Sequence, residues 1–215
     1  MKKILLTLAA LAVMTGAASA TDLPLHKKKH DKAPVAPVAA ATIPAYTNTI
    51  SAAYGLDSAP TGFTKKVDDA YAVTFTHAFS DGYTVGAAYG ATVLPGETKQ
   101  NVEAQVGYGT NVTNDIKLSG KIAVGERWQG NSFPFYAVYG NADYRINDKL
   151  TWNAIQYRYR KAFDTANEFE SHHLGTGLTY AITQQVAINT AVYRDFDKDF
   201  KGKDNGVLVG VAYKF

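Results

Sequence analysis

From Tyr46 onward, apolar and polar residues alternate with a period of two along most of the chain. This period predicts β-strands with two unlike faces, because successive side chains of a strand point to opposite sides. We count ten such segments, separated by residues typical of turns. They cover residues 45–55, 69–79, 83–93, 101–110, 115–127, 134–146, 149–162, 168–182, 185–196 and 205–215. The pattern therefore predicts an all-β fold with an even number of strands.

The connections between these segments alternate in length. The short ones are 80–82, 111–114, 147–148 and 183–184, and the long ones are 56–68, 94–100, 128–133, 163–167 and 197–204. Such alternation is typical of outer-membrane β-barrels, which have short periplasmic turns and longer outer loops. Both ends of the chain are then expected in the periplasm.

The two faces of the predicted strands differ in character. In the last strand, one face carries Val207, Val209, Val211, Tyr213 and Phe215, and the opposite face carries Leu208, Gly210, Ala212 and Lys214. A soluble sandwich also alternates, with its apolar face turned inward, so alternation alone leaves that alternative open. Small residues on the second face favour a narrow lumen. Tyrosines near many strand ends favour a barrel whose apolar face meets lipid, since aromatic residues gather at membrane interfaces.

The C-terminal residues carry a resemblance. Their pattern, from Val207 through Val209, Val211 and Tyr213 to Phe215, resembles the assembly signature that the barrel-assembly machinery recognises in bacterial outer-membrane proteins. The segment 21–24, followed by lysines and Pro/Ala repeats, is similar to small porin-like proteins of alphaproteobacteria. The resemblance implies a transmembrane antiparallel up-and-down β-barrel over residues 45–215, surrounded by outer-membrane lipids and lipopolysaccharide. Common small members have eight strands, so eight is the alternative to the ten counted.

The first 44 residues have a different composition. Residues 1–20 match a secretory signal peptide, with Lys2 and Lys3 before an apolar stretch and small residues at the expected cleavage site. Residues 21–44 combine a basic cluster at 26–32 with a Pro/Ala-rich tract, which predicts a flexible periplasmic arm. The arm is interpreted as a solvated tether; attraction of its basic cluster to peptidoglycan or anionic lipid is the alternative.

Charge and composition narrow the possible partners. The whole chain has a formal net charge of +3 and no cysteine, and the residues from Tyr46 onward hold 16 Lys and Arg against 17 Asp and Glu. A nearly neutral domain without a basic field does not indicate nucleic-acid binding. No pattern of residues predicts a metal site or a cofactor.

The polar face collects charges on four neighbouring strands. The predicted lumen cluster comprises Glu103, Lys117, Lys121, Arg127, Asp143, Arg145, Arg158 and Arg160. One hypothesis is a plug of salt bridges, for example Glu103 with Lys121 and Asp143 with Arg158, because buried charges need partners. The other is a narrow water-filled conduit whose basic surplus prefers small anions. A barrel of ten strands is closer in width to an eight-stranded barrel, whose interior is filled by side chains, than to the wide porins that hold open channels.

Enzymatic motifs find no support in the chain. The His-x-Ser arrangement of lipid A deacylases is absent, because neither His77, His172 nor His173 has a serine two residues later. An omptin-type protease would need His172 or His173 beside Asp164 or Asp195, and no motif indicates it. We therefore predict a structural or porin-like barrel and no enzyme. Recognition through the outer loops is the alternative, and lipid A modification is less favoured.

Overall fold

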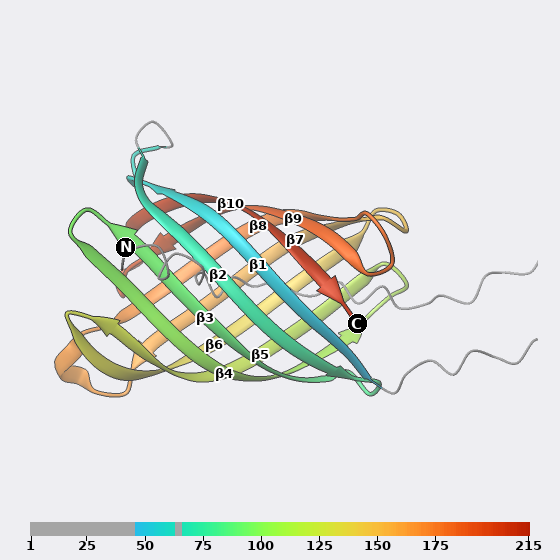
Figure 1. Cartoon of the computed structure of the whole chain (residues 1–215), viewed down its shortest axis with the longest axis horizontal. Helices are drawn as coiled ribbons and strands as arrows, with labels where there is room; N and C mark the ends of the chain where they lie inside the picture. Colours follow the sequence, from blue (N-terminus) through green and yellow to red (C-terminus); the bar gives the residue numbers. More distant parts are fainter. Residues whose placement is uncertain (1–45, 63–65) are drawn as a thin grey trace, which may run out of the picture.

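The computed structural model describes residues 46–62 and 66–215, so the predicted signal peptide and periplasmic arm lie outside the described residues. The chain forms a closed barrel of ten antiparallel strands (Figure 1). The strands are β1 (Tyr46–Ser58), β2 (Lys66–Phe79), β3 (Tyr83–Leu94), β4 (Glu97–Asn111), β5 (Ile116–Gln129), β6 (Asn131–Arg145), β7 (Leu150–Ala162), β8 (Glu170–Ala181), β9 (Val186–Phe196) and β10 (Gly202–Lys214). A 3-10 helix, η1 (Thr165–Asn167), precedes β8. Among the described residues, no helix is long and apolar enough to cross a membrane.

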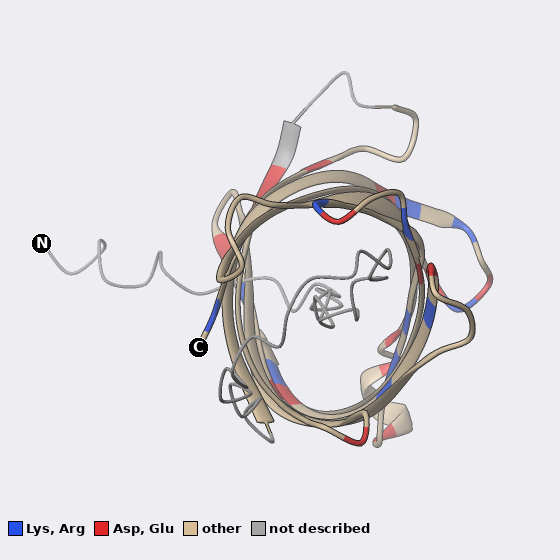
Figure 2. Cartoon of the chain, turned by 90° about the vertical axis from the view of Figure 1, so that its right-hand side faces the viewer, with Lys and Arg blue, Asp and Glu red and all other residues tan. Residues whose placement is uncertain are grey.

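Each strand pairs with its neighbours in the chain, and β1 pairs with β10 to close the ring (Figure 2). Opposite residues in this closing pair include Ile50 with Tyr213. The last residue completes it, because the backbone groups of Asn48 and Phe215 exchange two hydrogen bonds of 2.9 Å. Closure leaves the sheet without an edge. The prediction of a ten-stranded barrel is confirmed, and the eight-stranded alternative is wrong.

Short turns join the strands at the end of the barrel that holds Tyr46 and Phe215. These turns are 80–82, 112–115, 146–149 and 182–185. In the last three, a side-chain oxygen of Thr113, Asn147 or Thr183 accepts backbone N–H groups two and three residues later. Such local hydrogen bonds stabilise tight turns and fix the register of the flanking strands. The short connections predicted from the sequence are thus present.

At the opposite end, two of the five predicted long loops are absent. Pro95 and Gly96 alone join β3 to β4, and Gly130 alone joins β5 to β6. The prediction of long loops at 94–100 and 128–133 was wrong because polar residues there continue the strands. Both glycines have positive φ, 86° and 71°, which a tight reversal requires. The connections 59–65, 163–169 and 197–201 remain longer.

The outer face of the barrel is apolar at mid-height. Ile122, Val106 and Val138 lie opposite one another on adjacent strands, and their side chains are 65%, 53% and 42% exposed. On β10 the outward side chains alternate with buried ones, as in Val209 at 50% and Leu208 at 4% exposure. The apolar face of the strands therefore points outward. A soluble sandwich would turn this face inward, whereas a barrel in lipid exposes it.

An aromatic girdle surrounds the barrel near the short turns. Its exposed tyrosines are Tyr46, Tyr83, Tyr108, Tyr144, Tyr180 and Tyr213. All lie within the first or last four residues of their strands. This is the position at which aromatic rings meet the membrane–water interface.

Replacing Ile122 by lysine should lower the free energy of unfolding by about 2–4 kcal/mol, because the charge enters the lipid-facing midplane. Urea unfolding in lipid vesicles, followed by tryptophan fluorescence, measures this change. The matched control is Val112→Lys in the turn 112–115, which is also exposed and should cost about 0–1 kcal/mol. Equal costs for the two variants would contradict the assignment of this face to lipid.

Candidate functional site in the barrel lumen

A buried carboxylate lies inside the lumen. The Glu103 side chain on β4 forms an ion pair with Arg160 on β7 and accepts a hydrogen bond from the Tyr139 hydroxyl on β6. The amides of Asn101 and Gln105 also donate to it, at 3.4 and 3.3 Å. Because β4 and β7 are not neighbours, this ion pair crosses the interior and blocks part of it. Multiple donors compensate the carboxylate for its lost hydration.

A second charged group lies beside the first. Asp195 on β9 accepts from His173 Nδ1 at 2.9 Å and from Arg158 Nη2 at 3.4 Å. His173 is 2% exposed and stacks on the ring of Tyr193, with 4.6 Å between ring centroids. The group is therefore packed from β7, β8 and β9. Arg158 supplies the cation that pairs with Asp195, and His173 is hydrogen-bonded to the same carboxylate.

Tyr193 extends this network across β10. Its hydroxyl donates to the Asp57 carboxylate on β1, and its ring lies directly over Gly206 on β10. A side chain at position 206 would overlap this ring, so only glycine leaves space for the crossing. Through Tyr193 the polar network reaches β1, the first strand of the closed ring.

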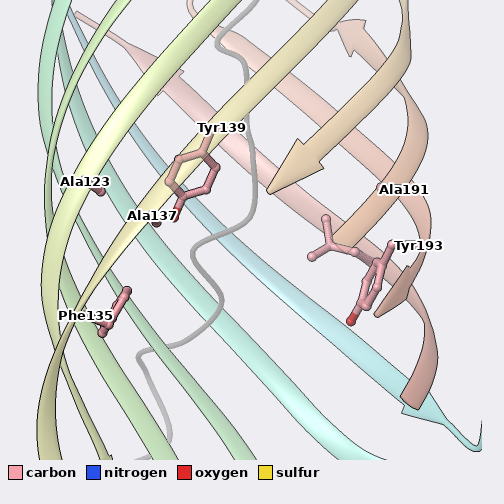
Figure 3. Packing of buried hydrophobic residues seen from close by; sticks show 7 residues of the cluster. Ala123, Phe135, Ala137, Tyr139, Ala191 and Tyr193 are labelled. Carbon is pink, nitrogen blue, oxygen red and sulfur yellow. The ribbon is translucent and has the colours of Figure 1, made fainter. Parts of the chain in front are cut away.

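Aromatic rings fill the space between these polar groups. Phe135 is fully buried on β6, and the Arg160 guanidinium lies 5.4 Å from its ring centroid. Phe135 and Tyr139 come from one wall of the barrel, and Tyr193 comes from β9 (Figure 3). Phe169 packs against Phe135, and Arg127 lies 4.7 Å from the Phe169 centroid. Polar and aromatic groups together form a plug across the lumen.

Five of the predicted lumen residues belong to, or contact, this plug. Glu103, Arg158 and Arg160 form its ion pairs, Arg127 packs on Phe169, and Lys121 lies over the Tyr139 ring. The other three predicted residues lie nearer the short turns. Lys117 and Asp143 are opposite one another on β5 and β6, and Arg145 pairs with Asp115 at the rim, at 2.9 Å. The structure thus divides the predicted cluster into two levels.

Both suggested salt bridges were wrong in their partners. Lys121 Nζ donates to Gln105 at 3.2 Å, since Arg160 occupies Glu103. Asp143 accepts from Asn153 at 2.8 Å, and Arg158 lies opposite Tyr139 in the register. The register of the strands explains both, since Glu103 lies opposite Gly125 and Asp143 lies opposite Asn153. Alternation in one sequence does not show which residues of two strands lie opposite one another.

A cavity of about 170 Å³ occupies the half of the lumen nearer the short turns. Gly82, Thr183 and Gln184, which belong to those turns, form part of its wall, so the cavity opens at that end. Most of the lining is neutral, with threonines, asparagines and small residues. The charged residues that line it are Lys117, Lys121 and Lys214. No carboxylate belongs to the described lining, although Asp143 lies opposite Lys117 on the neighbouring strand.

Acidic groups that the sequence-based cluster omitted balance the plug. Asp57 and Asp195 join it, Asp57 through Tyr193, and Asp195 through Arg158 and His173. Asp57 is near the outer end of β1, beyond the segment 45–55 that alternation indicated. The signal that could have located Asp195 is parity, since it shares a face with Tyr193.

One other candidate from the sequence, His172, lies outside the lumen. His172 faces outward and stacks on Phe200, with 4.1 Å between the ring centroids. Glu170 pairs with Lys161 on the outside, at 2.8 Å. Among the described residues, no group of three His, Cys, Asp or Glu side chains could hold a metal ion.

Comparison with known proteins identifies the fold. No family model and no curated protein matches the sequence. Among solved structures, the NanC porin aligns with a TM-score of 0.50 at 12% identity, covering 77% of this chain and all of that one. The KdgM porin aligns with a TM-score of 0.47 at 14% identity, covering 78% of this chain and 99% of that one. The chain folds as a bacterial outer-membrane β-barrel.

The apolar exterior and this fold place the chain in the outer membrane. The barrel is long enough for that role, because strands of 11–15 residues exceed the 9–11 that a tilted strand needs to cross a bilayer. The short turns lie at the same end as the start of β1 and the end of β10, which is the arrangement at the periplasmic end of outer-membrane barrels. The lysine-lined cavity opens at this end, and the plug lies nearer the opposite end.

Replacing Glu103 or Arg160 alone by glutamine should lower the free energy of unfolding by about 3–5 kcal/mol, because the remaining charge stays buried without its partner. The double variant should cost less than the sum of the two single variants. Urea unfolding in lipid vesicles measures all three.

The control is Asp115→Asn, which removes the exposed pair with Arg145 and should cost about 0–1 kcal/mol. A central role for the Glu103–Arg160 pair would be contradicted if each single variant lost as little stability as this control and the losses simply added in the double variant.

Proposed function

We propose that this barrel is a porin-like protein that passes small anionic solutes between the cell surface and the periplasm. The observation that carries the proposal is the lining of the periplasmic cavity, whose charged residues are Lys117, Lys121 and Lys214. A cationic wall in a narrow polar lumen attracts anions and repels cations. Neutral hydroxyl and amide groups on the same wall replace part of the solute's hydration.

The proposal includes a route for export and assembly. The predicted signal peptide, residues 1–20, would direct the chain out of the cytoplasm. The side chains of Val207, Val209, Val211, Tyr213 and Phe215, all outward and exposed, are proposed to be read by the barrel-assembly machinery. The basic arm before the barrel is proposed to remain in the periplasm, near peptidoglycan or anionic lipid.

The plug sets the size of the solute. A solute that leaves the cavity toward the cell surface meets the layer of Glu103, Arg160 and Tyr139, which spans from β4 to β7. Only small ions and solutes can pass such a layer without displacing it. We therefore expect a small single-channel conductance, well below that of wide porins.

Replacing Lys117 and Lys121 together by glutamine should lower the anion-to-cation permeability ratio toward equal permeability, because the two central cationic groups of the cavity are removed. The reversal potential of the purified barrel in a planar bilayer under a potassium chloride gradient measures this ratio.

The control for this experiment is Lys149→Gln, which removes a lysine of the same chemistry from the exposed turn 146–149. It should leave the ratio unchanged. A wild-type barrel without anion preference, or a double variant that keeps it, would contradict the proposed selectivity.

Replacing Glu103 and Arg160 together by alanine should raise the single-channel conductance several-fold, because both side chains that cross the lumen are shortened and neither charge of the pair is left without its partner. Current steps in planar bilayers measure it. Heat-modifiable migration on gels checks that the variant is folded. An unchanged conductance in a folded variant would show that ions do not pass through this layer.

A further inference from the structure

Arg194 interrupts the apolar outer face of β9 near its outer end. It lies between Val192 and Phe196 on the outward parity, and its side chain is exposed. In the register it lies opposite Leu174 of β8, which is 50% exposed, and Leu174 lies opposite Tyr157 of β7. Directly paired residues of a sheet project from the same face. The guanidinium therefore lies on the outside of the barrel, in a row of lipid-facing side chains.

This cation has no acidic partner among the described residues. The contact that the structure gives it is the ring of Phe196, with the guanidinium carbon 5.6 Å from the ring centroid. Lys161, also outward-facing at this end, pairs instead with Glu170 at 2.8 Å. A cation beside hydrocarbon is costly unless an anion or water accompanies it. Its position, two residues before the end of β9, places it at the outer interface, where phosphorylated headgroups lie.

The neighbouring strand leaves space for the guanidinium. At Gly202, the first residue of β10, a side chain would overlap the Arg194 guanidinium. Gly202 lies opposite Phe196, so the ring and the glycine together form a seat for the cation. The exposed guanidinium is planar, and its N–H groups can donate hydrogen bonds to a phosphate.

An aromatic wall adjoins this seat. Phe200, in the loop after β9, stacks on His172, and the Tyr157 hydroxyl is hydrogen-bonded to His172 Nδ1 at 2.8 Å. Phe200 has a φ of 57°, a conformation that costs energy for a residue other than glycine, and its ring is nevertheless 64% exposed. Asp197 holds the loop by accepting the N–H groups of Lys201 and Asp199 at 2.9 Å, and these hydrogen bonds lower the pKa of its carboxyl.

We propose that Arg194, with the aromatic wall of Phe196 and Phe200, is a binding site for a phosphorylated lipid of the outer leaflet. The phosphate accepts hydrogen bonds from the guanidinium, and an acyl chain covers the exposed ring of Phe200 and the side chain of Leu174. This site lies on the outside of the barrel, rests on its placement in the outer membrane, and is independent of conduction through the lumen.

Titration of the purified full-length barrel in detergent with lipid A tests this site, with native mass spectrometry as the readout. The wild type should bind lipid A that carries its phosphates at least about tenfold more tightly than lipid A from which they have been removed, as expected for hydrogen bonds between charged groups. Arg194→Gln should bind the two lipids equally. Arg194→Leu serves the same purpose if the glutamine variant does not fold.

The matched control is Arg145→Gln, which removes an arginine from the opposite end of the barrel and should retain the preference. Phe200→Ala should weaken the binding of both lipids by the same factor, because it removes the apolar contact and keeps the cation. The proposal is overturned if the wild type does not discriminate between the lipids, or if Arg194→Gln still does. It is also overturned if inorganic phosphate alone at equal concentration displaces lipid A, since the site would then bind phosphate and not lipid.

Discussion

Hydrocarbon offers no hydrogen bonds to a polypeptide backbone, and this absence governs the whole architecture. Each strand of a sheet has two rows of N–H and C=O groups, and in lipid both rows must be paired within the protein. Ten strands satisfy this condition because β1 pairs with β10. The backbone bonds between Asn48 and Phe215 extend the pairing to the last residue of the chain.

Closure separates the side chains into two environments with opposite requirements. Outward side chains meet lipid and are apolar through the middle of the barrel, while inward ones must fill a narrow tube. Charges in that tube lose water and need partners, which Glu103 finds in Arg160, and Asp195 in Arg158 and His173. Glycine at position 206 gives the space that the ring of Tyr193 needs. The resulting plug is thus both the packing of the barrel and the barrier in its lumen.

Features that depend on local alternation could be predicted from the sequence. The ten strands, the facing of Val209 and Leu208, and the short turns all follow from residue patterns within a few positions. Features that depend on the relation between strands could not. The register between β6 and β7 gave Asp143 and Arg158 partners other than the expected ones, because register is set by three-dimensional pairing. The polar hairpin at Gly130 was read as a loop for a related reason: above the membrane, strands lose their apolar face.

The same distinction between local and distant pairing bears on how the barrel assembles. Nine of the ten strand pairs join consecutive strands, and β1 with β10 is the exception. Hairpins with tight turns lose little chain entropy on closing, whereas the β1–β10 seam must join the two ends of the domain. Until that seam forms, an incomplete barrel exposes two rows of unpaired backbone groups in lipid. Formation of this seam is therefore the assembly step that depends most on other proteins. The strand ending at Phe215 is one of the two strands that form the seam.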